Sequence, residues 1–197
     1  MTNRFLSSHA RIIAVGCGCI SAVIYLIMIN LTLAHIEAVS GYIPFDLRPL
    51  GYGSADVAEL LEALGTDGRA YYLAYQIPLD TLYPAMLALT LIATLLWMGQ
   101  GSPKSVIVRV GILLSIGIAL FDYIENFGVL AMILTWPDVS DGLVYAASAA
   151  TIAKSVFTTL AVSSVFLSGI IRMRSLRALT TRPKVGVWGR FDRILDR

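Results

Sequence analysis

Residues 110–136 read VGILLSIGIALFDYIENFGVLAMILTW, and this stretch decides the fold. It is long enough to cross a hydrocarbon core about 30 Å thick, which takes roughly 20 helical residues at 1.5 Å each. Its only charged residues, Asp122 and Glu125, lie near its middle. Three more apolar stretches of comparable length run over residues 12–36, 73–98 and 143–171. The sequence therefore predicts an all-α polytopic membrane protein, a bundle of four transmembrane helices.

The composition excludes the soluble classes of protein. Of the 197 residues, 57% are hydrophobic and 14% are charged, and the mean hydropathy is +0.75. There are too few charges for disorder or a coiled coil, and two cysteines are too few for a disulfide scaffold. The first apolar stretch follows Arg4 and Arg11 as a signal peptide would. At about 25 residues it exceeds the roughly 7 to 15 of an h-region, which favours a membrane anchor.

Lys and Arg residues are distributed unevenly among the segments that flank the apolar stretches. Twelve of the fifteen precede the first stretch, separate the second from the third or follow the fourth, whereas the other side has only Arg48 and Arg69. By the positive-inside rule, both termini and the loop after Met98 are cytoplasmic. We therefore expect a multi-pass protein of the bacterial inner (cytoplasmic) membrane. The net charge of +2 gives no reason to expect nucleic-acid binding.

The chain divides into one transmembrane domain and a tail. Residues 1–171 contain the four apolar stretches and an external segment, residues 37–72. Residues 172–197 form a basic cytoplasmic tail with eight positive and two negative charges. Such a tail either lies on an anionic membrane surface or is an ordinary stop-transfer cluster.

The external segment has two parts. Residues 41–53 (GYIPFDLRPLGYG) are rich in Gly and Pro, which predicts an extended and turning chain. Residues 54–65 predict a short amphipathic helix that lies over the outer mouth of the bundle. Ser54 is its N-cap, and one stripe holds its aliphatic residues Val57, Leu60, Leu61 and Leu64. This helix is either a functional lid or a surface helix that only closes the bundle.

Four ionisable residues lie inside the predicted spans: Asp80, Asp122, Glu125 and Lys154. A charge there costs about 2.5 to 3.5 kcal/mol on insertion scales, so such residues are functional-site candidates. At 1.5 Å per residue, all four lie roughly 10 to 21 Å below the external helix ends and can share one layer. We take them as the candidate catalytic residues, the acids for proton transfer or hydrogen bonds and Lys154 for stabilising an anion.

Polar residues near these four share their helical faces. Because lipid cannot satisfy polar groups, such faces must turn inward and meet. Pro78 and Pro84 bracket Asp80 and predict a kink in that helix. The candidate ligand-binding residues on the polar faces are Asn30, Gln76, Tyr83, Asn126, Thr151 and Ser155.

The same cluster has a purely structural interpretation. Lys154 would pair with Glu125 or Asp122, only to hold four helices in register. Glu125 and Lys154 lie at the same predicted depth below the external helix ends, so Glu125 is the better partner for Lys154. Three carboxylates and one ammonium leave a charge of −2. We therefore expect at least one carboxyl to stay protonated, with Asp122 the better proton holder.

The sequence predicts no cofactor and no metal site. His9 and His35, the two histidines, lie at opposite ends of the first apolar stretch. This placement argues against a zinc hydrolase or a bis-histidine haem, and leaves a single axial ligand at His35 as an alternative. Cys17 and Cys19 point about 200° apart on a helix and cannot chelate together. No phosphate-binding glycine loop, nucleophile elbow or CxxC motif occurs.

Four segments resemble a group of small bacterial four-span membrane proteins that are uncharacterised. The segments are FDLRPLGYG (45–53), LLEALGTDGRAYYLAYQIPLDTLYP (60–84), FDYIEN (121–126) and AATIAKS (149–155). This resemblance brings no activity with it. The architecture is also similar to that of sterol-isomerase-like and sigma-2-receptor-like proteins, which implies four spans with intramembrane acids around a pocket for an amphiphile.

The polar layer predicts a pocket for a small amphipathic molecule, such as a lipid, isoprenoid or sterol-like compound, which arrives from the outer leaflet or the external face. Membrane lipid and this ligand are the expected partners.

Two other classes of protein stay open. One is a non-enzymatic assembly or accessory subunit of a membrane complex. The other is a proton-coupled carrier, which the small size and the lack of repeats disfavour unless the chain forms a homo-oligomer. Whether the protein is an enzyme is left open by the sequence.

Overall fold

The computed structural model describes residues 2–99 and 105–180, which are predominantly helical and contain no strand. They form four helical rods. The first rod is α1 (Thr2–Ile27), the π-helical turn η1 (Met28–Thr32) and α2 (Leu33–Ser40). The second is α3 (Ser54–Tyr71), the π-helical turn η3 (Tyr72–Gln76) and α4 (Ile77–Met98). The third and fourth are α5 (Val106–Thr135) and α6 (Asp141–Thr180).

Four helical stretches within the described residues are long and apolar enough to cross a membrane: His9–Ser40, Ser54–Met98, Val106–Thr135 and Asp141–Ser175. Large apolar side chains, such as Leu113, Phe127 and Phe166, remain exposed on the outside of the bundle, as a lipid-facing surface requires. These features support a multi-pass membrane protein and confirm the predicted all-α four-helix bundle. The predicted basic tail lies largely outside the described residues.

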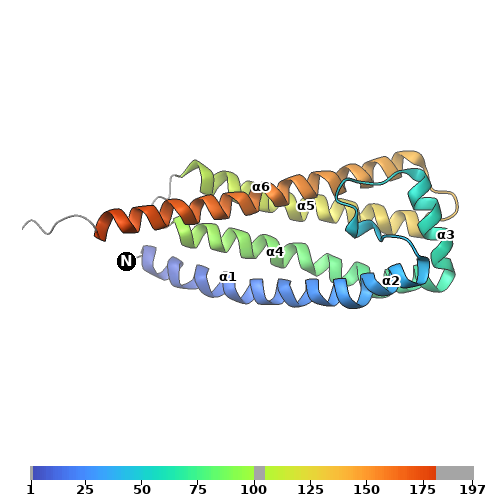
Figure 1. The fold of residues 1–197 in the computed structure, drawn as a ribbon, viewed down its shortest axis with the longest axis horizontal. Helices are drawn as coiled ribbons and strands as arrows, with labels where there is room; N and C mark the ends of the chain where they lie inside the picture. The colour runs from blue at the N-terminus through green and yellow to red at the C-terminus, as the bar shows by residue number, and fades with distance from the viewer. Residues whose placement is uncertain (1, 100–104, 181–197) are drawn as a thin grey trace, which may run out of the picture.

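The four rods pack in chain order. The helix α1 packs against α4, α4 against α5, and α5 against α6, and α4 also contacts α6. Among the described residues, α1 and α6 share no extended contact. In the view of Figure 1, α1 lies along one margin of the bundle, and α6 crosses α5 on the other side of α4. The bundle is therefore incompletely closed along α1 and α6.

The helix α3 crosses one end of the bundle (Figure 1). Its aliphatic stripe, which comprises Val57, Leu60, Leu61 and Leu64, is buried against the ends of the rods. Gly65, with φ 62° and ψ −171°, breaks α3, and the part of α3 after Gly65 continues through η3 into α4. Because a side chain disfavours this backbone conformation, Gly65 makes the corner. We call this the α3 end of the bundle.

The chain between α2 and α3, which we call the 41–53 loop, runs back along the bundle from the α3 end (Figure 1). Phe45 belongs to its single 3-10 turn η2 (Phe45–Leu47), is fully buried and lies 4.8 Å from the Tyr52 ring. The backbone N–H of Tyr52 donates to Ser148 Oγ of α6 at 2.8 Å. Burial raises the pKa of Tyr52, so its hydroxyl stays neutral. The loop is thus a packed layer of the bundle.

Gly51 is the point at which this loop approaches α6 most closely. It has φ 86°, and a Cβ there would lie 2.5 Å from Ser148 Oγ and 3.0 Å from Ile152 Cδ1. We expect Gly51→Ala to destabilise the loop by about 1–3 kcal/mol, through backbone strain and this clash. The measurements are thermal unfolding and the rate of proteolysis within residues 41–53.

Gly41→Ala is the matched control. Gly41 also has a positive φ, 76°, but no heavy atom lies within 4 Å of its Cβ position. An equal loss in both variants would mean that the contact of the loop with α6 adds nothing to stability.

The second rod changes its helical pitch just before Pro78. A proline lacks the N–H that an α-helix needs, and its ring clashes with the carbonyl one turn earlier. The π-helical turn η3 lies at this position, and π-turns commonly accommodate such disruptions. This turn η3 ends just before Pro78 and holds Tyr72 and Gln76 as buried residues. The kink predicted around Asp80 stays a prediction.

Candidate functional site

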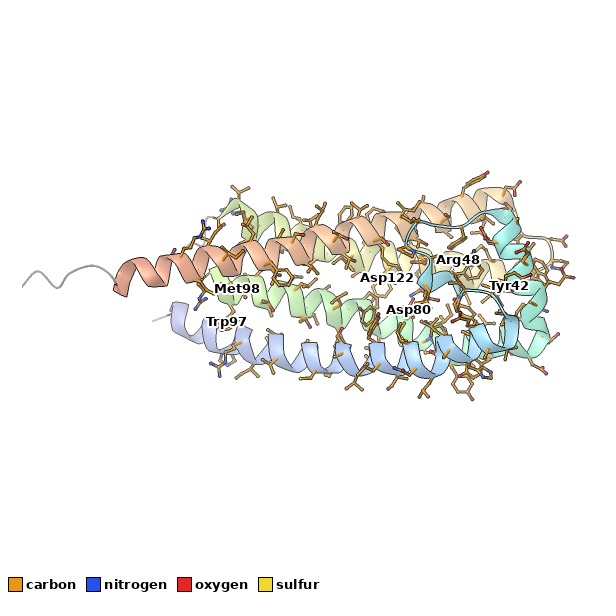
Figure 2. All side chains as sticks on the ribbon, viewed as in Figure 1. Tyr42, Arg48, Asp80, Trp97, Met98 and Asp122 are labelled. Atoms are coloured by element: carbon orange, nitrogen blue, oxygen red, sulfur yellow. The ribbon has the colours of Figure 1, made fainter. Side chains whose placement is uncertain are left out.

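A pocket of about 330 Å³ lies between α1, α4, α5, α6 and the 41–53 loop. Its polar lining includes Asp46, Asp80, Asp122 and Lys154. Its apolar lining includes Met28, Ile29, Leu33, Leu47, Leu87 and Ile118. Figure 2 shows Asp80 and Asp122 between the ribbons of α1 and α6, in the half of the bundle nearer to the α3 end. The pocket thus has apolar walls around an ionisable centre.

Lys154 of α6 forms ion pairs with two acids of α5. Its Nζ lies 2.5 Å from Glu125 Oε2 and 3.4 Å from Asp122 Oδ1. Both acids are buried, with 1% exposure for Glu125 and 2% for Asp122. The shorter distance to Glu125 agrees with the partner predicted from depth. The protonation state of Asp122 stays a prediction.

Asp80 of α4 is buried, with 3% of its surface exposed, and lines the same pocket. Its Oδ2 has no hydrogen-bond partner among the described residues. Its backbone carbonyl accepts a hydrogen bond from Asn126 Nδ2 of α5 at 2.8 Å. Asn126 therefore fixes α4 against α5 beside Asp80, while one carboxylate oxygen of Asp80 is left unpaired.

Asp46 is the carboxylate of the pocket lining that sequence reasoning missed. It lies in η2 of the 41–53 loop, where it accepts hydrogen bonds from the Tyr72 hydroxyl and, at 3.2 Å, from Gln76 Nε2. Gln76 Oε1 in turn accepts a hydrogen bond from Thr32 Oγ1 of η1 at 2.5 Å. This chain of hydrogen bonds connects both π-helical turns to the loop. The sequence signal that could have identified Asp46 is a charged residue between two apolar residues, Phe45 and Leu47, in a stretch rich in Gly and Pro.

Other predicted ligand-binding residues have different positions. Tyr83 lines the pocket, and its ring lies 5.8 Å from that of Tyr25 of α1. Ser155 also lines the pocket, and its hydroxyl donates to the Thr151 carbonyl within α6. Thr151 is buried and donates to the Ala147 carbonyl. Gln76 contacts Asp46 as described, behind the pocket surface.

Asn30 is not brought into the cluster. Its side chain is exposed and donates to the carbonyl of Leu26 in its own helical rod at 2.8 Å. The pocket residues of this rod, Tyr25, Met28, Ile29 and Leu33, define a different face. The predicted placement of Asn30 was therefore wrong, because a lone amide satisfied by its own backbone has no need to turn inward.

Several other basic residues have contacts outside the pocket. Arg48 donates to Asp56 Oδ1 at 2.5 Å and to the Ile43 carbonyl at 3.0 Å. At the opposite end of the bundle, where Figure 2 labels Trp97, the Arg172 guanidinium donates to the Trp97 carbonyl and lies over its ring. His35 lies against the Tyr71 ring. Within the described ranges, no three His, Cys, Asp or Glu side chains form a group that could hold a metal ion.

Compared with known proteins, the chain matches no family model, no curated protein and no solved structure. The resemblance to small bacterial four-span proteins stays a prediction, and the candidate function is argued from the pocket.

Proposed function

We propose that the pocket binds a small amphipathic molecule, such as a lipid, isoprenoid or sterol-like compound. One observation carries this proposal: apolar side chains of the first rod, α4 and α5 surround a centre formed by Asp80, Asp122 and Lys154. A volume of about 330 Å³ lies within the usual range of ligand pockets, roughly 300–1,000 Å³. The apolar part of the ligand would contact Met28, Leu87 and Ile118, and its polar end would face the charged residues.

The same geometry favours access from the bilayer. The helix α3 and the 41–53 loop cover the α3 end of the bundle, whereas α1 and α6 share no extended contact in the described residues. Two residues of the pocket lining, Tyr25 of α1 and Thr159 of α6, are exposed on that side. An amphiphile would therefore enter sideways between α1 and α6, with its chain still in the membrane.

If the ligand is also processed, the charged residues have distinct roles. Asp80 and Asp122 would transfer protons or donate hydrogen bonds, because both line the pocket. Glu125 would hold Lys154 in place, and Lys154 would stabilise a developing negative charge. These roles keep Asp80, Asp122 and Lys154 as candidate catalytic residues and change Glu125 from a catalytic to a positioning residue.

Filling the pocket tests the proposal. Leu87 lines the pocket, whereas Leu89 on the same helix is 44% exposed on the outside. We expect Leu87→Trp to abolish labelling of the pocket by a photoactivatable long-chain alcohol, because the indole occupies the ligand volume. Leu89→Trp should leave the labelling unchanged. The measurement is mass spectrometry of labelled peptides, with protein in phosphatidylcholine nanodiscs. Labelling spread over the whole lipid-facing surface, and unaffected by Leu87→Trp, would contradict the proposal.

The second candidate is an assembly or accessory subunit without a ligand. The double pairing of Lys154 with Glu125 and Asp122 favours it, because such a pair can hold helices in register without any substrate. In that case the exposed apolar faces of the bundle would contact a second copy or another membrane protein. A proton-coupled carrier has no separate observation in its favour.

We also propose that the protein lies in the inner (cytoplasmic) membrane with both termini in the cytoplasm. The distribution of Lys and Arg supports this orientation. A reporter that works only in the cytoplasm should be active after Arg197 and between Met98 and Lys104, and silent near Gly65. Reporter activity at Gly65 would reverse the orientation.

A further inference from the structure

We infer that the polar end of the bound molecule is a cationic amine, and that Asp80 is the group that receives it. This inference rests on the proposed function, since it names the class of amphiphile that the pocket would take. Three observations support it: the charges of the pocket, the bonds that those charges already make, and a buried oxygen of Asp80 that has no hydrogen-bond partner.

The pocket region contains more acids than bases. Asp46, Asp80 and Asp122 line it, and Glu125 lies behind Lys154. With four carboxylates against the single ammonium of Lys154, the formal charge is −3 when all are ionised. Charge at this depth is costly unless it is compensated. A ligand with a positive charge reduces the imbalance, whereas a carboxylate or phosphate group increases it.

The protein's own cations near the pocket are already engaged. Lys154 lies 2.5 Å from Glu125 and 3.4 Å from Asp122. Arg48, two residues from Asp46, is turned toward Asp56 at 2.5 Å. Asp46 receives its hydrogen bonds from neutral groups, the Tyr72 hydroxyl and the Gln76 amide. Among the described residues, Asp80 is in no ion pair.

Asp80 also lacks a donor for one of its oxygens. Asp80 lines the pocket, and its buried Oδ2 has no hydrogen-bond partner among the described residues. Glu125 Oε1 also lacks one, but Glu125 pairs with Lys154 and does not line the pocket. A buried acceptor without a donor is costly, and a charged one more so. An ammonium group supplies both the N–H donors and the positive charge. A hydroxyl supplies a donor alone, and an anion supplies neither.

The aromatic rim suits the same ligand. Tyr83, one turn after Asp80 on α4, and Tyr25 of α1 both line the pocket, and their rings are stacked. Aromatic faces attract cations through their negative π surface. An amphiphile that enters between α1 and α6 would pass these rings before its amine reaches Asp80.

The test compares three compounds of equal chain length, dodecylamine, dodecanol and dodecanoate, as competitors of the photoactivatable alcohol in phosphatidylcholine nanodiscs. We expect the amine to compete about tenfold better than the alcohol, because the ammonium supplies a positive charge as well as N–H donors. The dodecanoate should compete worst. Asp80→Asn should weaken competition by the amine about tenfold and leave that by the alcohol within about twofold.

Glu59→Gln is the matched control, since it removes an exposed acid of α3 and should change nothing. If Asp80→Asn fails to fold, competition by the three compounds on the wild-type protein still tests whether the pocket prefers an amine, because amine and alcohol are compared on the same protein. Specific pocket labelling with no preference for the amine would overturn this inference and leave the proposed function standing. Absence of specific pocket labelling would overturn both. An amine preference that persists in Asp80→Asn would overturn the role of Asp80.

Discussion

Replacing Lys154 with Met is expected to lower the free energy of unfolding by about 3–5 kcal/mol. The substitution removes the ammonium that lies 2.5 Å from Glu125 and 3.4 Å from Asp122, and leaves both buried acids without a counter-charge among the described residues. Adding Glu125→Gln should restore most of the loss, because the nearer acid then carries no charge. The measurement is equilibrium unfolding of the single and the double variant in the same detergent or nanodisc.

Val156→Met is the control for the methionine itself. Val156 lies on the same helix but is 50% exposed, so the change should have little effect. Wild-type stability of Lys154→Met would contradict the structural interpretation of the pair and favour a site in which Lys154 serves a ligand. Loss without rescue by Glu125→Gln would mean that Asp122 is the acid that matters.

Gly128→Ala is expected to destabilise the bundle by about 1–3 kcal/mol, although alanine is the better helix former. A Cβ on Gly128 would lie 2.5 Å from Ala147 Cβ and 3.3 Å from Ala147 Cα. Because one of these atoms is backbone, α5 and α6 must move apart. Thermal unfolding, with chemical crosslinking across the two helices, measures the effect.

Gly16→Ala is its control within the membrane region. No heavy atom lies within 4 Å of the Cβ position of Gly16 in α1. Alanine should therefore stabilise α1 slightly, by about 0.5–1 kcal/mol. Equal behaviour of the two variants would show that the close approach of α5 and α6 is not required.

Sequence patterns predicted the four helices because length and hydropathy are local properties. The span at 110–136 needed only its own composition, and α5 covers Val106–Thr135. The meeting of Asp122, Glu125 and Lys154 followed from depth along helices of known rise. These steps need no knowledge of which helix contacts which.

The 41–53 loop could not be predicted in the same way. Its position depends on distant contacts, such as the Tyr52 N–H with Ser148 Oγ and the Tyr72 hydroxyl with Asp46. A chain rich in Gly and Pro has no periodicity from which to read a buried face. Asp46 therefore looked like one of several external acids. The prediction for Asn30 was wrong for a different reason. It used only the polarity of Asn30 and did not consider that Met28 and Leu33 define the face of this rod that lines the pocket.

The contact of the 41–53 loop with α6 has a consequence for biosynthesis. The loop leaves the ribosome early, but its partner Ser148 is 96 residues further along the chain than Tyr52. Lys154 lies on that same last helix, whereas Asp80, Asp122 and Glu125 belong to α4 and α5. While α4 and α5 are being inserted, their three acids have no ammonium to pair with. Insertion of α6 then supplies both Lys154, which pairs with Asp122 and Glu125, and Ser148, against which the loop packs. The protein therefore completes its charged layer and its pocket in one final step.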